Sequence, residues 1–181
     1  MDQSPTIEQG EPPGPLDFLE FARARSPQLF RTAYLLTGGD AHLAEDLVQE
    51  ALSRMFVRWR RLSRLENPAG YAQTVLANAF LSLRRRRSST EKVTEEFPEL
   101  AVTDGDSALR LTLLQALRQL SPQDRAVLVL RFWEDRSVEE TAADLQLSST
   151  AVRSRTHRAL GRMRALLGDS FASFADEPAR R

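Results

Sequence analysis

The stretch SVEETAADLQLSSTAVRSRTHRAL, residues 137–160, has the pattern of two short helices joined by a tight turn. Ala142 and Leu145 fall on one face of the first helix, and Val152 and Leu160 continue this apolar face along the second. Two such helices can share one small core. The pattern therefore predicts a helix-turn-helix unit.

The second of these helices is strongly basic. Ser148 is placed to cap its N-terminus. The segment from Leu145 to Gly168 contains no acidic residue, and its arginines are Arg153, Arg155, Arg158, Arg162 and Arg164. A helix of this kind suits the DNA major groove, where arginine contacts phosphates or guanine edges. The alternative is an amphipathic hairpin with solvated arginines, but exposed helices usually mix both signs of charge, so the one-signed charge favours a polyanion.

The composition limits the class of protein. The chain has 181 residues, 41% of them hydrophobic, with no cysteine and no apolar run near the ~20 residues that span a bilayer. These features predict one or two small helical domains without a disulfide, a thiolate-bound metal or a membrane insertion. The first 16 residues have three acids, no base and no apolar core. We therefore expect no signal peptide and a cytoplasmic protein.

The formal net charge of zero hides a sorting of charge along the chain. Residues 17–87 carry 12 basic and 7 acidic side chains, residues 88–107 carry 1 and 6, and residues 108–167 carry 10 and 6. Basic modules bind phosphate by releasing counterions.

We expect an all-α fold of two small helical domains joined by a flexible acidic linker. The expected parts are a disordered start (1–16), the first domain (17–87), the linker (88–107), the second domain (108–168) and a tail (169–181).

The first domain opens with two expected helices. Apolar spacing predicts one over residues 17–37, with Pro27 kinking or interrupting it and Gly38 and Gly39 ending it. Asp40 can cap the next, whose apolar period lasts over four turns. The other face of that helix carries an acid-rich stripe at i, i+3, i+4 and i+7: Asp46, Gln49, Glu50 and Ser53. Periodicity alone leaves two interpretations of this stripe open, a solvated face or a partner-binding surface.

A third helix of this domain is expected to begin at Asn67 and Pro68, a cap followed by a first-turn proline. It ends in four consecutive arginines, Arg84, Arg85, Arg86 and Arg87. Cations at a helix C-terminus complement the macrodipole, but four exceed what that effect requires, so a phosphate contact is favoured. In the second domain we expect a helix from Ala108 to Leu120 and another that starts at Ser121 and Pro122, ahead of the helix-turn-helix.

Several motifs in order resemble one family. They are AYLLTGGDAHLAEDLVQEAL (33–52), NPAGYAQTVLANAFLSLRRRR (67–87), LRQLSPQDRAVLVLRFWED (117–135) and the helix-turn-helix. The chain resembles, over residues 17–167, the extracytoplasmic-function group of sigma-70 family RNA polymerase sigma factors, most nearly their actinobacterial branch. The resemblance implies a factor that binds core RNA polymerase, recognises the −35 and −10 promoter elements and helps melt the DNA.

The resemblance also implies site residues. The stripe of Asp46, Gln49, Glu50 and Ser53 would dock on the clamp helices of the polymerase largest subunit, and the second domain would meet the flap region of the second-largest subunit. The expected −10 contacts are Leu62, Asn67, Asn78, Arg84, Arg85, Arg86 and Arg87, with the connector from Leu62 to Asn67 helping to hold a flipped base. The expected −35 contacts are Ser149, Thr150, Arg153, Ser154, Arg155, His157 and Arg158. An anti-sigma factor is a further partner that the family allows.

The chain departs from the family pattern at the helix-turn-helix. Gln146 stands where the family usually has glycine, and a left-handed conformation there costs a non-glycine residue roughly 1 kcal/mol. Thr150 and Ala151 replace the family's Gly-Thr pair, and Thr156 stands where leucine is common. These differences bear on the promoter sequence more than on the function.

The competing function is a free-standing helix-turn-helix regulator that does not act as a polymerase subunit. Such a regulator does not need an acidic docking stripe followed by a capped helix with four terminal arginines, so the first domain favours the sigma factor. An enzyme has little support, because His42 and His157 are far apart in the sequence and no glycine-rich phosphate loop follows a strand pattern. We expect no catalytic residue, no metal and no cofactor.

Overall fold

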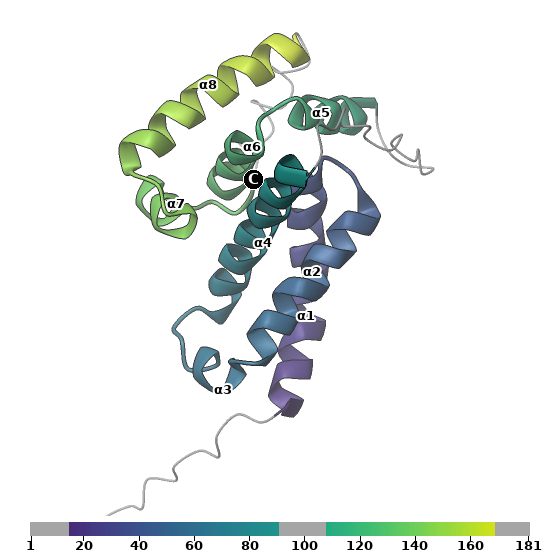
Figure 1. Cartoon of the computed structure of the whole chain (residues 1–181), viewed down its shortest axis with the longest axis vertical. Helices are drawn as coiled ribbons and strands as arrows, with labels where there is room; N and C mark the ends of the chain where they lie inside the picture. The colour runs from purple at the N-terminus through teal and green to yellow at the C-terminus, as the bar shows by residue number, and fades with distance from the viewer. Residues whose placement is uncertain (1–14, 91–107, 169–181) are drawn as a thin grey trace, which may run out of the picture.

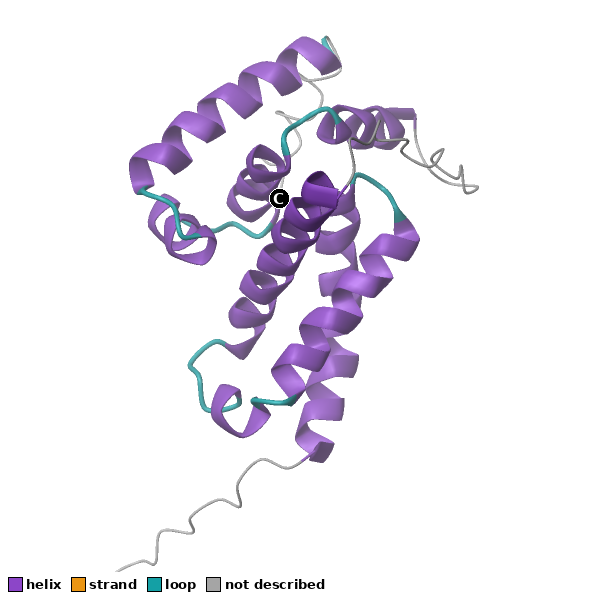
Figure 2. Ribbon diagram, viewed as in Figure 1, coloured by secondary structure: helices purple, strands orange, loops and turns teal. Residues whose placement is uncertain are grey.

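The structure, a computed structural model, describes residues 15–90 and 108–168, and within these ranges every regular element is helical (Figure 2). In chain order the elements are α1 (Pro15–Thr37), α2 (Ala41–Phe56), α3 (Trp59–Leu62), α4 (Pro68–Thr90), α5 (Ala108–Arg118), α6 (Pro122–Leu128), the π-helical segment η1 (Val129–Trp133), α7 (Val138–Leu145) and α8 (Ser149–Leu167). The predicted all-α class is confirmed. None of the helices described here is long and apolar enough to cross a membrane.

The first domain is built on α1, α2 and α4, which lie side by side along the long axis of the molecule (Figure 1). Its core is formed by nearly inaccessible side chains such as Leu36, Leu47 and Phe80. Gly38 and Gly39 have φ values of +70° and +94° and end α1 as expected, because glycine adopts this backbone at no steric cost. Of the two effects expected of Pro27, an interruption is wrong, since α1 runs through this residue as one helix.

Helix α4 begins at the predicted cap. The backbone N–H of Gly70 donates a hydrogen bond to Asn67 Oδ1 at 2.8 Å, and Pro68 occupies the first turn, where no backbone N–H is required. The helix ends at Thr90, three residues beyond the expected domain boundary at residue 87. Most of the expected acidic linker, together with the expected disordered start and tail, lies outside the described residues.

The second domain packs α5, α6 and α7 against α8, the long helix at the top of Figure 1. The predicted caps are present, because Ser121 Oγ accepts a hydrogen bond from the Asp124 N–H and Ser148 Oγ accepts one from the Ala151 N–H. Gln146 adopts the left-handed conformation expected for the turn, with φ 54° and ψ 45°. The helix-turn-helix prediction therefore holds in its local geometry.

The two domains are in direct contact across α4. Buried side chains of α6, η1 and α7 belong to the same continuous apolar core as those of α1, α2 and α4. Val127 and Leu130 are fully buried in it, beside the first-domain residues Leu36, Leu76 and Phe80. The surface of α4 that faces the second domain is thus removed from solvent.

Candidate functional site

The acid-rich stripe of α2 lies on the outward face of that helix. Asp46, Gln49 and Ser53 are exposed, and Glu50 is half-buried and forms an ion pair with Arg54. The opposite face of α2 packs into the core through Ala44, Leu47, Val48, Ala51 and Met55. The helix is therefore fixed by its apolar face, and its acid-rich face is accessible from solvent.

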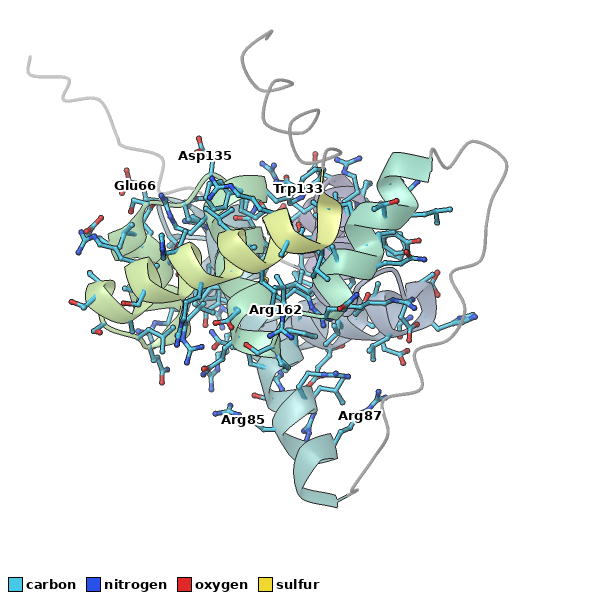
Figure 3. All side chains as sticks on the ribbon, turned by 90° about the horizontal axis from the view of Figure 1, so that it is seen from above. Glu66, Arg85, Arg87, Trp133, Asp135 and Arg162 are labelled. Atoms are coloured by element: carbon cyan, nitrogen blue, oxygen red, sulfur yellow. The ribbon has the colours of Figure 1, made fainter. Side chains whose placement is uncertain are left out.

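The run of arginines at residues 84–87 lies in the last two turns of α4, and three of its four members are exposed. Figure 3 shows Arg85 and Arg87 at the free end of the helix, away from the packed domains. Arg84 is half-buried, and burial together with the charge of Arg87 lowers the pKa of its guanidinium. The end of α4 thus carries a concentrated positive charge, as a backbone contact with nucleic acid requires.

The remaining expected −10 residues have different environments. Asn67 uses its side-chain oxygen to cap α4. Leu62 is only 6% exposed and packs in the core, so it supports the connector and its side chain is not presented to solvent. Asn78 is half-buried, and its Nδ2 donates hydrogen bonds to the carbonyl oxygens of Thr74, at 3.0 Å, and Asp144, at 2.9 Å. The expected −10 residues are therefore not gathered on one open surface.

The basic helix α8 buries Val152, Ala159 and Met163 and presents most of the expected −35 residues outward. Thr150, Arg153, Ser154, His157 and Arg158 are exposed, and Ser149 and Arg155 are half-buried. The sequence therefore predicted correctly which face of this helix is accessible.

The two leading arginines of α8 differ in how they are held. Arg153 pairs with Glu139 at 3.0 Å, and both side chains are more than 60% exposed. Arg155 pairs with Asp124 of α6 at 2.8 Å, and their side chains are 25% and 22% exposed. Exposed ion pairs contribute little to stability, so breaking the Arg153 pair costs little free energy. Breaking the Arg155 pair costs more, because both of its side chains are partly shielded from solvent.

Two acidic residues that were not expected from the sequence join the domains. Glu134, which directly follows η1, accepts hydrogen bonds from side chains of α1 and α4. Asp144 of α7 accepts a hydrogen bond from Thr74 Oγ1 at 2.7 Å, in addition to the Asn78 bond at its carbonyl oxygen. No local signal could have identified them, because their partners lie at least 61 residues away in the sequence.

Within the part of the chain that the structure describes, no group of three or more His, Asp or Glu side chains could hold a metal ion. His42 and His157 are both exposed and lie in different domains. The described surface carries an acid-rich stripe on α2, a run of arginines in the last turns of α4 and a basic helix-turn-helix, an arrangement that suits a DNA-binding protein with a protein partner.

Comparison with known proteins identifies the family. Residues 21–90 match sigma-70 region 2, and residues 110–163 match sigma-70 region 4. The RNA polymerase sigma-E factor of Streptomyces coelicolor is 39% identical over 151 residues, which cover 82% of this chain and 85% of that protein. The ECF RNA polymerase sigma factor SigE of Mycolicibacterium smegmatis is 33% identical over 172 residues, 89% of this chain and 64% of that protein.

A solved structure agrees with the sequence matches. It is the sigma factor RpoE of Bartonella quintana in complex with the anti-sigma factor NepR, with a TM-score of 0.71 and 26% identity over 84% of this chain and 98% of that chain. The chain belongs to the sigma-70 family, in its extracytoplasmic-function group. It is a polymerase-binding sigma factor that directs promoter-specific transcription, and a free-standing regulator is not favoured, because the region 2 match covers nearly all of the first domain.

Proposed function

We propose that this sigma factor divides its task among three helices, with residues 17–87 acting as region 2 and residues 108–168 as region 4. Helix α2 docks on the clamp helices of the polymerase largest subunit through Asp46, Gln49, Glu50 and Ser53. Helix α4 and its preceding connector engage the −10 element, and α8 reads the −35 element. Region 4 also meets the flap region of the second-largest subunit.

The observation that carries this proposal is the separation of charge on the described surface. The outward face of α2 is acid-rich, whereas the free end of α4 and the outward face of α8 are basic. A protein partner and a nucleic acid can therefore bind at the same time without competing for one patch. The factor acts in the cytoplasm, positions the polymerase and catalyses no reaction itself.

The test is to mix the purified chain with sigma-free core RNA polymerase and measure complex formation and run-off transcription from a panel of promoters at defined salt. A complex with specific transcripts supports the proposal. Failure to bind core polymerase, combined with specific duplex binding by the chain alone, would overturn it in favour of a free-standing regulator. The salt must be stated, because phosphate contacts make DNA affinity strongly salt-dependent.

A further inference from the structure

One arginine of the basic helix α8 is tied to the helix that packs against it. Arg155 Nη1 donates to Asp124 Oδ1 of α6 at 2.8 Å. Helices α6 and α8 are in direct contact (Figure 1), so this ion pair crosses the interface between them. Both side chains are partly shielded, and solvent therefore screens their attraction less than it would on an open surface.

The carboxylate of Asp124 is held on a rigid turn. Its backbone N–H donates to the α6 cap, Ser121 Oγ, at 3.2 Å. The next residue, Arg125, is 1% exposed, and its Nη2 donates to the carbonyl oxygens of Arg118 and Leu120 at 2.9 and 3.3 Å. The aspartate side chain is short and adds little freedom to this fixed backbone. It can therefore determine where the longer arginine side chain lies.

Arg155 lies at the edge of the accessible face of α8. With Arg158 and Arg162 it follows the spacing i, i+3 and i+7, so the three side chains line one edge of the helix. Arg158 and Arg162 are exposed, whereas Arg155 is half-buried. A guanidinium carries several N–H donors in a planar fork, and among the described residues Arg155 uses one of them, for Asp124. The other donors are available to a second acceptor.

Arg153, two residues earlier, is held more loosely. Its partner is Glu139 of α7, at 3.0 Å, and both side chains are more than 60% exposed. An exposed ion pair fixes the position of a side chain only weakly. Arg153 thus suits a phosphate, which attracts a cation from many directions, whereas the fixed Arg155 suits a base edge, which requires aligned donors.

The carboxylate of Asp124 also changes what Arg155 contributes to DNA affinity. A guanidinium and a carboxylate in contact carry no net charge together, so the pair adds little to the sequence-independent attraction for phosphate. The remaining N–H donors still form directional hydrogen bonds with a guanine edge. The pair therefore favours discrimination between sequences over general DNA affinity.

We propose that Asp124 is a positioning residue for −35 recognition: it fixes the Arg155 guanidinium so that the remaining N–H donors meet a base edge in the major groove. The ion pair persists in the promoter complex. The proposal rests on the assignment of α8 to the −35 element. Ordering a long side chain at an interface lowers affinity by about 3–10-fold, and an arginine that is already held avoids most of this loss. The gain is confined to the base pair that Arg155 reads.

The test measures base preference in the complete holoenzyme. Wild-type and variant chains are assembled with core RNA polymerase. Their affinities are compared for a promoter duplex that the wild-type protein transcribes and for duplexes in which one −35 base pair at a time is replaced. Arg155→Ala should lose preference at one base pair, which identifies the base that Arg155 reads. Asp124→Ala should lower preference at the same base pair by about 3–10-fold and leave the other positions unchanged.

The matched control is Glu139→Ala, which removes the carboxylate paired with Arg153 and changes the net charge by the same amount. Both variants should bind every duplex more tightly at low salt, because a negative charge beside the DNA is lost. Only Asp124→Ala should alter base preference. In the Arg155→Ala background, Asp124→Ala should change base preference no further, whereas a purely structural role would lower affinity in both backgrounds.

The wild-type holoenzyme tests the proposed function separately. If it shows no preference at any −35 base pair, the assignment of α8 is wrong and this proposal fails with it. If it does discriminate, three results overturn this proposal alone: no loss of preference in Arg155→Ala, no loss in Asp124→Ala, or an equal loss at every position in Asp124→Ala. Thermal melting establishes that each variant is folded. Asp124→Asn, which removes the charge and keeps the shape, replaces Asp124→Ala if that variant unfolds.

Discussion

Replacing Gln146 with glycine should stabilise the protein. Gln146 is exposed and left-handed, with φ 54° and ψ 45° at the end of α7. This conformation costs an L-residue about 1–2 kcal/mol, a cost that glycine does not carry. Glycine instead loses more backbone entropy on folding, about 0.5–1 kcal/mol. The balance is a net gain of about 0.75 kcal/mol, within a range of about 0–1.5 kcal/mol, and the central value corresponds to a rise in Tm of about 1.5–3 °C for a chain of this length.

Thermal and denaturant unfolding of three proteins measures this gain: wild type, Gln146→Gly and Gln146→Ala. Alanine keeps the Cβ atom that creates the steric cost, so the Gln146→Ala variant should gain nothing. The reasoning is refuted if the glycine variant melts at or below the wild-type temperature, or if alanine stabilises equally. Promoter affinity should be the same for all three, because the substitution preserves the turn that positions α8.

Three further predictions concern function. Asp46→Arg with Glu50→Arg should abolish binding to core polymerase in a pull-down assay while circular dichroism shows unchanged helical content; unchanged binding would contradict the docking assignment. Arg155→Ala should weaken promoter affinity by about 1–3 kcal/mol if Arg155 contacts a base. If affinity for unrelated duplexes falls by the same amount, Arg155 contacts a phosphate instead, which is the result expected for Arg153→Ala. Asn78→Ala should reduce permanganate reactivity of the melted −10 region, with duplex binding at the −35 element unchanged; full melting would remove Asn78 from that role.

Local signals explain why much of the fold could be predicted. Gly38 and Gly39 were expected to end α1 because glycine tolerates positive φ, and both have it. Ser148 was expected to cap α8, and its hydroxyl accepts the Ala151 N–H. Helical periodicity assigned the acid-rich stripe to an outward face because the apolar residues of the same helix determine which face is buried.

The contacts between the domains could not be predicted because they depend on residues distant in sequence. Glu134 and Gln28 are 106 residues apart, and Arg125 and Leu36 are 89 apart. Periodicity reports which face of a helix is apolar, and it does not report which other helix covers that face. The half-buried pair of Arg155 with Asp124 was missed for the same reason, since the two residues belong to different helices.

Two arginines of the second domain anchor it on the C-terminal end of α1. Burial, reinforced by the charges of Arg84 and Arg118, lowers the pKa of Arg125 to about 10, so its guanidinium stays protonated at neutral pH and needs the helix-end carbonyls. Arg118 Nε donates to the carbonyl oxygen of Gly38 in the turn that leads to α2. Burial lowers the pKa of this guanidinium, and the nearby carboxylate of Asp40, the cap of α2, partly offsets that effect. The turn that leads into α2 therefore also holds the second domain. If α2 binds the polymerase as proposed, a displacement of α2 relative to α1 would act directly on these two hydrogen bonds.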